Sequence, residues 1–445
     1  MKFRGARRYL DSLSGVKRLS INIKGKDKIV VHLILLTQKG KSGNRAIVIV
    51  NGKKFAIQES WTVILSMLIK VVGKYGDIAI GKWKFEELKK ETCTELRKCF
   101  LLPIYAKDVL MNELDSLLKA LEDIANGETC FYNEEVSLLD YASCLSGPIS
   151  MDFVVNATVR DEEGLKYVEY PGVIDYFFNT ATSEMKMADW IEVVEKLRKE
   201  AYVYKLNFTG IEPTSSENLP GLIKVARDFV TKLDTNGIKL ADEEYCNSLV
   251  DANLDEVEII LYSSNPEVHN EISKTPNGFE NTLQGIKNAL EAGFKVYVNI
   301  PIVKEEQNYM ETIKYLQELG VKNVKCFRKF AKEQETDPLT VRKLEKILGE
   351  ATKFCKENNM TFLFTTPGLI SRRIYKKIGL EAPICNACIY NMAILPNGDV
   401  LPCENWNRNM PLGNILQTPW EKIWNSPKTK NLKSRIIGSP FSCKK

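Results

Sequence analysis

The sequence predicts an α/β protein: a partial (β/α)6 barrel, with an α+β domain before it and a short hairpin region after it. Between residues 149 and about 324, β-branched or aromatic runs alternate with amphipathic stretches, which is typical of βα units around a parallel sheet. Residues 1–145 instead place strand patterns before helical patterns. Near the C-terminus, cysteines flank a Pro-Asn-Gly-Asp segment, whose composition favours a hairpin turn.

The N-terminal region predicts three strands followed by three helices. The strand patterns lie at 18–24, 29–37 and 46–57, and the helical patterns at 59–72, 85–99 and 109–125. This order resembles the RiPP recognition element, a module that holds the leader peptides of ribosomally made natural products by adding a strand to its sheet edge. The resemblance implies a peptide-binding domain at residues 1–145. An unrelated α+β domain has the same order, so both interpretations stay open.

The middle of the chain predicts six strands with five helices between them. Strands are expected at 150–157, 202–208, 237–240, 257–261, 295–302 and 321–327, and helices at 190–200, 221–233, 243–252, 279–292 and 309–319. Six such strands make a partial barrel, which we place at residues 146–375.

The start of this barrel resembles the radical S-adenosylmethionine (SAM) family. Its first predicted strand ends in Asn156-Ala157-Thr158, as the family's first strand does before a CxxxCxxC motif. In that family the three thiolates hold three irons of a [4Fe-4S] cluster and leave the fourth iron for SAM. Asp161, Leu165 and Val168 occupy the three cysteine positions here. Leucine and valine have no lone pair for iron, so we expect a degenerate, TIM-like radical SAM barrel without the radical SAM cluster.

A second part of the resemblance follows the next predicted strand. Gly210-Ile211-Glu212-Pro213 is similar to the family's GGEP turn, whose backbone and carboxylate bind the amino group of SAM in active members. The resemblance implies that Gly210 and Glu212 mark a degenerate SAM-binding turn. Ile211 cannot follow glycine into positive φ and adds bulk where the methionine end of SAM would lie, which argues against SAM binding. Segments 234–237, 265–269 and 278–286 are similar to later signatures of the family.

The C-terminal cysteines resemble the opening of a SPASM domain, the auxiliary-cluster module of peptide-modifying radical SAM proteins. Nine residues separate Cys388 from Gly398, and four separate Gly398 from Cys403. Two auxiliary clusters need about eight thiolates, whereas this region offers only Cys385, Cys388, Cys403 and Cys443. We therefore expect a truncated SPASM- or twitch-like domain at residues 376–445 with at most one metal centre. One iron-sulfur cluster, one zinc ion, or reduced thiols without metal all fit the spacing.

The composition is that of an ordinary protein of two or three domains. The chain has 445 residues, of which 44% are hydrophobic and 27% charged. No secretory leader or membrane span is recognised, so the eleven cysteines predict a reducing cytoplasm. His32 and His269 are the only histidines, which argues against a histidine-centred mechanism.

Positive charge is concentrated at the N-terminus. Residues 1–54 contain fourteen Lys and Arg against Asp11 and Asp27, a net charge of +12, whereas the remainder carries about −7. This asymmetry fits either a solvated sheet face or a docking surface for an acidic chain. Nucleic acid is not expected as the partner, because no nucleic-acid motif or aromatic platform accompanies the charge. The docking hypothesis places a peptide at a sheet edge flanked by Lys24, Lys26, Lys28, Lys53 and Lys54.

Together these features predict a pseudo-radical-SAM protein in the maturation of a ribosomally made peptide. Its expected partners are a precursor peptide and an active radical SAM maturase or paralogue, and its expected role is non-catalytic binding. The alternative is a peptide-modifying enzyme that uses one C-terminal iron-sulfur or zinc centre, or SAM without a radical mechanism. Iron content and SAM binding separate the two.

Overall fold

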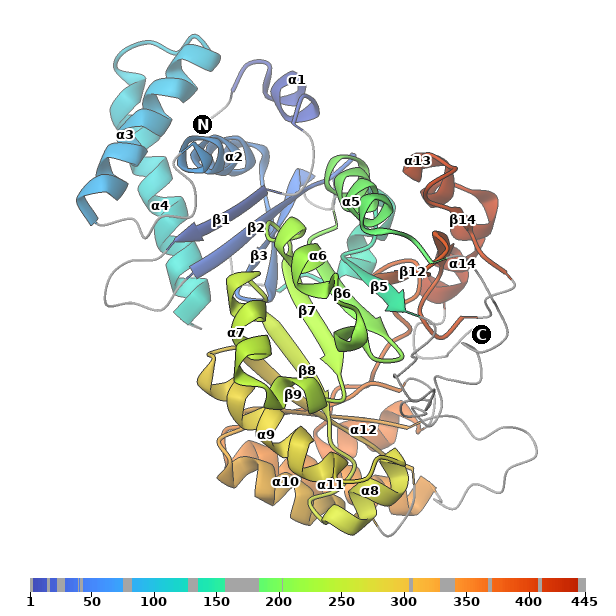
Figure 1. Cartoon of the computed structure of the whole chain (residues 1–445). Coiled ribbons are helices and arrows are strands. Elements are labelled where there is room, and N and C mark those ends of the chain that lie inside the picture. The colour runs from blue at the N-terminus through green and yellow to red at the C-terminus, as the bar shows by residue number, and fades with distance from the viewer. Residues whose placement is uncertain are drawn as a thin grey trace. The chain divides into compact units, whose positions relative to one another are not determined.

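The computed structural model describes residues 3–13, 17–21, 29–38, 40, 43–74, 82–126, 135–156, 184–201, 203–303, 307–328, 341–366, 370–406 and 410–438. The chain divides into two compact units (Figure 1). The first comprises Met1–Ile149 and Glu195–Tyr204, and the second comprises Ser150–Val194 and Lys205–Lys445. The further boundary expected at residue 375 stays a prediction.

The first unit contains a four-stranded antiparallel sheet in the order β1-β2-β3-β4. The strands are β1 (Lys17–Ile21), β2 (Ile29–Leu35), β3 (Ala46–Val50) and β4 (Lys53–Ile57). The single strand predicted at 46–57 is wrong, because it is a hairpin. Asn51 and Gly52 form its turn with φ of 47° and 90°. Asn-Gly tolerates this left-handed backbone, so the dipeptide was a readable hairpin signal.

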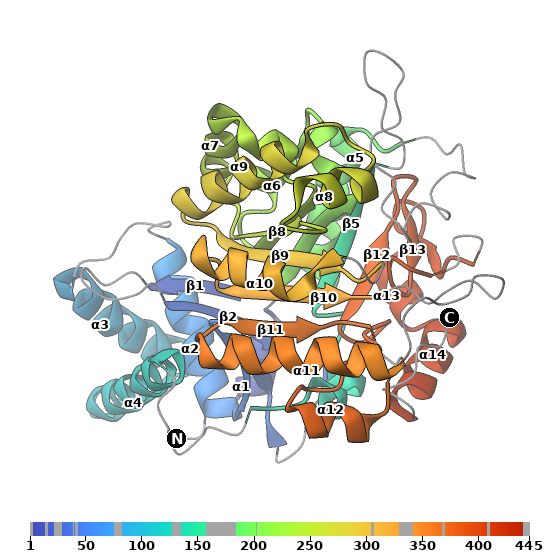
Figure 2. The ribbon, with the colours of Figure 1, turned by 90° about the horizontal axis from the view of Figure 1, so that it is seen from below.

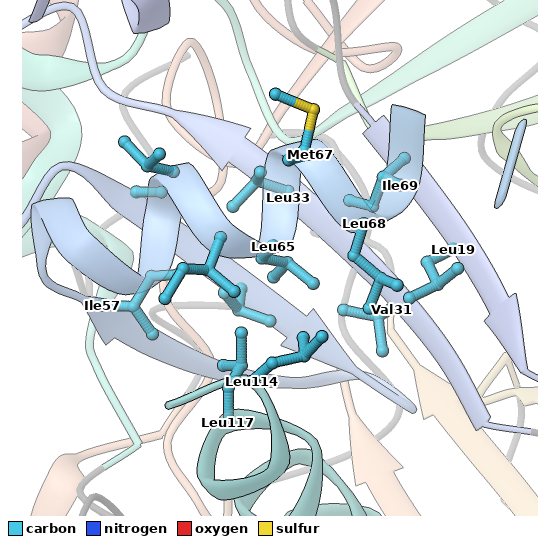
Figure 3. Packing of buried hydrophobic residues seen from close by; sticks show 14 of the residues in the cluster. Leu19, Val31, Leu33, Ile57, Leu65, Met67, Leu68, Ile69, Leu114 and Leu117 are labelled. Atoms are coloured by element: carbon cyan, nitrogen blue, oxygen red, sulfur yellow. The ribbon is translucent and has the colours of Figure 1, made fainter. Parts of the chain in front are cut away.

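Helices of the first unit cover this sheet and confirm the predicted helical patterns. They are α1 (Ala6–Asp11), α2 (Glu59–Gly73), α3 (Lys82–Cys99), α4 (Ala106–Asn126) and the 3-10 helix η2 (Leu138–Cys144). Leu65 and Leu68 of α2 gather with Val31 of β2 and Leu114 of α4 in one apolar cluster (Figure 3). The unit thus has its own hydrophobic core, as an independent domain requires.

The second unit is built on a ten-stranded sheet in the order β11-β10-β9-β8-β7-β6-β5-β12-β13-β14. Its strands are β5 (Ser150–Asn156), β6 (Lys205–Gly210), β7 (Val230–Thr235), β8 (Glu256–Ile260), β9 (Lys295–Pro301), β10 (Asn323–Phe327), β11 (Thr361–Phe364), β12 (Asn391–Ile394), β13 (Asp399–Leu401) and β14 (Gly413–Asn414). Strands β5 to β11 are parallel. The expected α/β fold with a parallel sheet is confirmed, and the sheet does not close within the described residues.

Two details of the strand prediction are wrong. The third strand lies at Val230–Thr235, where the sequence suggested the end of a helix, and the segment predicted as that strand forms the 3-10 helix η6 (Ile238–Ala241). Strand β11, which adds a seventh parallel strand beside β10, was not predicted. Four of the six residues in the Val-Thr-Lys-Leu-Asp-Thr sequence of β7 are polar, and this composition hid the strand.

The helices of the second unit are α5 (Met187–Lys196), α6 (Leu219–Val225), α7 (Glu243–Asp251), α8 (Pro266–Ser273), α9 (Gly278–Glu291), α10 (Tyr309–Glu318), α11 (Val341–Glu357), α12 (Arg372–Ile378), α13 (Trp420–Trp424) and α14 (Pro427–Gly438). Helices α5 to α12 lie along one face of the parallel sheet, and α13 and α14 lie beside the C-terminal strands (Figures 1 and 2). Within the described ranges, no helix has the length and apolar character that a membrane crossing needs.

The C-terminal hairpin extends the same sheet. Strand β12 pairs in parallel with β5, and β13 pairs antiparallel with β12 around the Pro396-Asn397-Gly398 turn. Gly398 has a φ of 84°, and Asn397 Oδ1 accepts a hydrogen bond from the Asp399 N–H, as in a tight polar turn. The hairpin is therefore a direct continuation of the barrel strands and places its residues beside the end of β5.

Candidate functional site

One face of the parallel sheet in the second unit is polar. Leu206, Leu233 and Val257 are buried on the opposite face, where Phe153 of β5 contacts Trp190 of α5. Between these apolar positions stand charged and amide side chains, aligned across neighbouring strands by the register. We call this surface the polar face, and its described members are Asp152, Lys205, Asn207, Lys232, Asp234, Glu256, Glu258, Lys295, Tyr297, Asn299, Lys325 and Asn391.

Lys232 is the central cation of the polar face. Its Nζ lies 2.6 Å from Asp234 Oδ1 and 2.5 Å from Glu258 Oε2, and Lys325 also pairs with Glu258. Burial disfavours the charged amine, but the two carboxylates outweigh it and hold the pKa of Lys232 well above its usual value. Burial likewise opposes ionisation of Glu258, yet Lys232 and Lys325 hold its pKa far below the ordinary range. Lys232 and Glu258 are therefore both ionised at neutral pH.

A second part of the polar face holds carboxylates with fewer cations. Asn207 Nδ2 donates to Asp152 Oδ1 at 3.2 Å and to Asp234 Oδ2 at 2.7 Å, and Asn391 Nδ2 also donates to Asp152. Burial raises the pKa of Asp152 to about 6. Glu404, in the turn that follows Cys403, is partly buried, and its burial and the repulsion from Asp152 and Asp234 raise its pKa to about 8. We call Asp152, Asp234 and Glu404 the carboxylate end.

The pKa of Glu404 predicts an unusual pH dependence for its removal. In the unfolded chain this group loses its proton near pH 4.5, whereas the folded protein keeps it to about pH 8. Ionisation of the unfolded state therefore lowers stability as pH rises across this window. Glu404→Gln abolishes this loss, so at pH 8 we expect the variant to be more stable than the wild type by about 4 kcal/mol. At pH 5 the difference should fall to about 1 kcal/mol. Urea unfolding at both pH values measures it, and an equal difference at pH 5 and pH 8 would contradict the assignment.

The ends of β5 and β6 are joined by Asn156 and the Gly-Ile-Glu-Pro turn. Asn156 Nδ2 donates to the Glu212 carbonyl at 2.7 Å, and its Oδ1 accepts from the Ile211 N–H at 3.1 Å. Gly210 has a φ of 147°, and a Cβ there would lie 2.4 Å from Asn156 Oδ1. Glycine is therefore required at this position. Ile211 is not among the described residues with positive φ, so the turn needs only its first glycine.

The carboxylate of Glu212 accepts four hydrogen bonds from within the protein. Oε1 accepts from the Thr214 N–H at 3.1 Å and from the hydroxyls of Thr214 and Thr235, both at 2.6 Å. Oε2 accepts from the Asn236 N–H at 2.8 Å. Burial raises the pKa of Glu212, while these donors favour its ionised form. Three of these four hydrogen bonds go to Oε1 and one goes to Oε2. Glu212 thus links the ends of β6 and β7 through donors of the protein itself.

Ile211 belongs to a small apolar cluster at the same end of the sheet. Its side chain is buried with Val154 of β5 and with residues of the C-terminal hairpin, and Trp406 packs against them. The hairpin members of the cluster are Ala393, Leu395 and Leu401. The side chain that replaces the second glycine of the turn is therefore held by contacts on several sides.

Truncating Ile211 measures how much this packing contributes to the free energy of unfolding. We expect Ile211→Gly to lower the free energy of unfolding by about 3–4 kcal/mol, because it removes a buried side chain, leaves a cavity and adds backbone freedom. Ile211→Val is the matched control and should cost about 1 kcal/mol. Denaturant unfolding measures both variants. Similar midpoints for the glycine variant and the wild type would show that Ile211 is not packed as described.

The predicted metal ligands are only partly within the described residues. Cys385 and Cys388 are buried, and the Cys388 N–H donates to the Pro402 carbonyl at 3.1 Å, which brings Cys388 beside the residue before Cys403. Burial raises the pKa of the Cys388 thiol to about 12. Within the described ranges, no group of three or more His, Cys, Asp or Glu side chains is arranged to hold a metal ion. Cys443 lies outside these ranges, so the four-cysteine site stays a prediction.

The loop that would carry the radical SAM cluster cannot be placed. Asp161, Leu165 and Val168 lie outside the described residues. The chain contains no CxxxCxxC motif at any position. On donor chemistry alone, the residues at these three positions do not fit a [4Fe-4S] cluster.

The polar face was missed in the sequence, although its signal was present. Parallel strands covered on both faces read as continuous apolar runs. Here Lys232 and Asp234 alternate with apolar positions in β7, and Glu256 and Glu258 do so in β8. Such alternation in a parallel sheet indicates a face that no helix covers.

Comparison with known proteins gives two domain matches. Residues 175–316 match the radical SAM superfamily, and residues 385–445 match the iron-sulfur cluster-binding SPASM domain. A probable GTP 3',8-cyclase of Methanococcus maripaludis is 36% identical over 118 residues, which cover 26% of this chain and 39% of that protein. The corresponding protein of Thermococcus kodakarensis is 32% identical over 116 residues, 26% of this chain and 37% of its own length. The chain thus spans well under half of these curated relatives.

Solved structures show the same fold over a greater length. Streptococcus suis SuiB bound to S-adenosylmethionine has a TM-score of 0.58 at 16% identity, with 90% of this chain and 89% of SuiB covered. The protein anSMEcpe with bound AdoMet and Cp18Cys peptide has a TM-score of 0.50 at 16% identity, with 64% and 82% covered. At this identity the likeness concerns the fold. The solved structures thus show the fold, and the two family matches relate residues 175–316 to the radical SAM superfamily and residues 385–445 to the SPASM domain.

Proposed function

We propose that this protein binds a precursor peptide, or the active radical SAM maturase that carries it, and performs no radical chemistry of its own. Its setting would be the maturation of a ribosomally made peptide. The observation that carries the non-catalytic part is the Gly-Ile-Glu-Pro turn, where Ile211 is packed against the C-terminal hairpin and the Glu212 carboxylate already accepts four hydrogen bonds. The packed Ile211 side chain and the structural use of the Glu212 carboxylate both disfavour binding of the methionine end of SAM at this turn.

The sequence around the lost cysteines supports the same proposal. The radical SAM match begins at residue 175, after Asp161, Leu165 and Val168. The similarity to that superfamily therefore rests on the strands and helices that follow the cluster loop. A scaffold that keeps its fold while losing cluster ligands suits binding better than catalysis.

A peptide fits an edge of the N-terminal sheet. Strand β4 carries Lys53 and Lys54, but the Lys54 carbonyl accepts from the Val136 N–H at 2.9 Å, and Lys54 pairs with Glu135 at 3.6 Å. Part of this edge is thus occupied. Strand β1 forms the opposite edge and pairs only with β2 within the described residues. We therefore place the peptide along β1, whose sequence begins with Lys17 and Arg18. Lys24, Lys26 and Lys28, which follow β1, lie outside the described residues.

The C-terminal cysteines support one metal centre in this proposal. The SPASM match is to a domain described as iron-sulfur cluster-binding, and Cys385, Cys388 and Cys403 lie within it, as does Cys443. Four thiolates suffice for one iron-sulfur cluster or one tetrahedral zinc ion. The centre would hold the hairpin together beside β5. Iron, sulfide and zinc analysis of anaerobically purified protein, with Cys388→Ser as the control, identifies it.

Binding to the peptide encoded beside the gene tests the proposed role. Equilibrium dialysis with labelled peptide should show binding that needs no SAM. If charge steers the encounter, raising the salt concentration from about 0.05 to 0.5 M should weaken and slow it, because the Debye length falls from roughly 14 to 4 Å. The double variant Lys17→Glu/Arg18→Glu should abolish peptide binding. The control double variant Lys428→Glu/Lys430→Glu, whose lysines are exposed in α14, should bind the peptide as the wild type does. Equal binding by both double variants would refute the placement of the peptide along β1.

A further inference from the structure

The loop between α3 and α4 of the first unit holds apolar side chains out in solvent. Leu101 is 91% exposed, and Ile104 and Tyr105 are each 79% exposed. Val109, one helical turn after Tyr105 on α4, is 49% exposed. We call this group the apolar tip, and its members are Leu101, Pro103, Ile104, Tyr105 and Val109. Single exposed apolar residues are ordinary, whereas several at one place mark a surface that binds a partner.

Hydrogen bonds fix the backbone of the apolar tip. At the end of α3, the Leu102 N–H donates to the Arg97 carbonyl at 2.9 Å. The Leu101 N–H donates to the Lys98 carbonyl at 3.4 Å. These two bonds form the Schellman motif that ends many helices. Arg97 Nε also donates to the Pro103 carbonyl at 3.3 Å, so α3 holds the loop in a defined shape.

Leu101 is an unfavourable residue for its position. It has a φ of 49°, in the left-handed region, at the place in the Schellman motif where glycine or asparagine is usual. A leucine there strains the backbone, and its exposed side chain adds almost no packing in return. By contrast, its neighbours Phe100 and Leu102 pack against the hydrophobic core. Folding does not account for Leu101, which indicates a role in binding.

Cations stand at the base of the apolar tip. No residue from 99 to 106 is charged. Arg97 and Lys98 precede this run in the last turn of α3, and Lys107 follows it, exposed, in the first turn of α4. Lys98 also lies 3.1 Å from Glu95 at the surface of α3. The loop thus combines an apolar end with basic residues on both flanking helices.

The charge of this part of the chain favours an anionic partner. Residues 1–149 contain 24 Lys and Arg against 17 Asp and Glu, a net charge of +7. A standard protein–protein interface takes about 20–30 residues from each partner, whereas the apolar tip has five. A lipid surface needs no matching pocket, and its anionic headgroups attract basic residues beside an inserted apolar segment.

We propose that the apolar tip inserts into the surface of a membrane that contains anionic lipid. Leu101 and Ile104 enter the boundary between headgroups and acyl chains, where their apolar surface leaves water. The ring of Tyr105 lies at the level of the headgroups, as amphipathic aromatic side chains do. Arg97 and Lys107 face the lipid phosphates. The tip lies on the membrane without crossing it, and this contact needs neither the peptide nor the maturase of the proposed function.

Sedimentation with lipid vesicles tests the proposal on the full-length protein. Sucrose-loaded vesicles are made of phosphatidylcholine alone or of equimolar phosphatidylcholine and phosphatidylglycerol. The wild type should sediment with the anionic vesicles and should need at least about fivefold less lipid than with phosphatidylcholine, because each basic residue near an anionic surface strengthens binding. Absence of sedimentation with the anionic vesicles would overturn the proposal.

Leu101→Gly separates membrane binding from folding. Glycine suits the left-handed position, so the variant should unfold at a denaturant concentration close to or above that of the wild type. Its affinity for the anionic vesicles should fall at least about tenfold, because it lacks a side chain that enters the lipid. Val250→Ser is the matched control, since it removes an exposed apolar side chain from α7, and it should bind as the wild type does. Equal affinity of Leu101→Gly and the wild type would contradict the insertion of the tip.

The basic residues are tested by the double variant Lys98→Gln/Lys107→Gln. It should bind phosphatidylcholine vesicles as the wild type does and lose most of the preference for anionic vesicles. An unchanged preference would contradict the placement of these cations at the lipid surface.

Sedimentation velocity without lipid tests whether the apolar tip joins two copies of the chain instead. The wild type and Leu101→Gly should sediment alike. A wild-type dimer that becomes a monomer in Leu101→Gly, together with no binding to vesicles, would overturn the membrane proposal and assign the tip to self-association.

Discussion

Replacing Lys232 with methionine is expected to lower the free energy of unfolding by about 3–5 kcal/mol. Methionine fills a similar volume but leaves Asp234 and Glu258 without the ammonium that lies 2.6 and 2.5 Å from them. A buried carboxylate that has lost its partner is far more costly than the intact pair is stabilising. Lys325 still pairs with Glu258, so Asp234 suffers most. Denaturant unfolding at pH 7 measures the loss.

The stability that Lys232→Met loses should depend on pH in one direction. The pKa of Glu258 is depressed in the folded protein, so its stabilising contribution is present above its unfolded pKa near 4.5 and is lost as pH falls towards the folded value. Lys232→Met removes the main cause of this depression, and the gap between variant and wild type should shrink below about pH 4.5. Lys224→Met, exposed in α6, is the control and should stay within about 0.5 kcal/mol of wild type at every pH. A comparable loss in both variants would refute the buried ion network.

Glu212→Ala is expected to destabilise the protein by about 3–5 kcal/mol. The change leaves the N–H groups of Thr214 and Asn236 and the hydroxyls of Thr214 and Thr235 without their common acceptor in a buried turn. It also removes the link between the ends of β6 and β7. Thermal or urea unfolding gives the magnitude.

Glu217→Ala supplies the matched control for Glu212. Glu217 lies five residues further along the chain and is exposed, so its removal should change stability by less than about 0.5 kcal/mol. The stability of Glu212→Ala bears on function. If the Glu212 carboxylate served to bind SAM, it would not be needed for folding when SAM is absent. A stability of Glu212→Ala close to that of wild type would therefore favour a ligand-binding role for Glu212 and weaken the case for a non-catalytic protein.

Much of the fold could be predicted because the residue pattern of most segments agrees with the helix or strand that they form. The pattern at 279–292 predicts a helix with one apolar face, and α9 forms at Gly278–Glu291. Strand β9 likewise reads as a β-branched run. The exceptions have physical causes. Four of the six residues of β7 are polar, because one face carries Lys232 and Asp234 and the other carries two threonines beside Leu233. The periodicity of so short a segment does not distinguish such a strand from the end of a helix.

The candidate site was less predictable because its groups are distant in sequence. Glu404 directly follows Cys403, whereas Asp152 lies on β5, and the pairing of β12 with β5 places the C-terminal hairpin beside that strand. The sequence motif identified both Ile211 and Glu212, because Ile211 departs from the GGEP turn and Glu212 matches it. It could not show that Glu212 accepts hydrogen bonds from Thr235 and Asn236 at the end of the next strand, since these bonds depend on tertiary structure.

The most direct test of the non-catalytic role is a search for SAM cleavage. The full-length protein is purified without oxygen, reconstituted with iron and sulfide, and incubated with SAM and dithionite, and 5′-deoxyadenosine is quantified by mass spectrometry. Cys388→Ser, treated identically, reports whether incorporated iron depends on the C-terminal cysteines. We predict iron that is reduced or lost in this variant and no 5′-deoxyadenosine above the protein-free background in either protein. Formation of 5′-deoxyadenosine in proportion to the wild-type protein concentration would contradict the non-catalytic role.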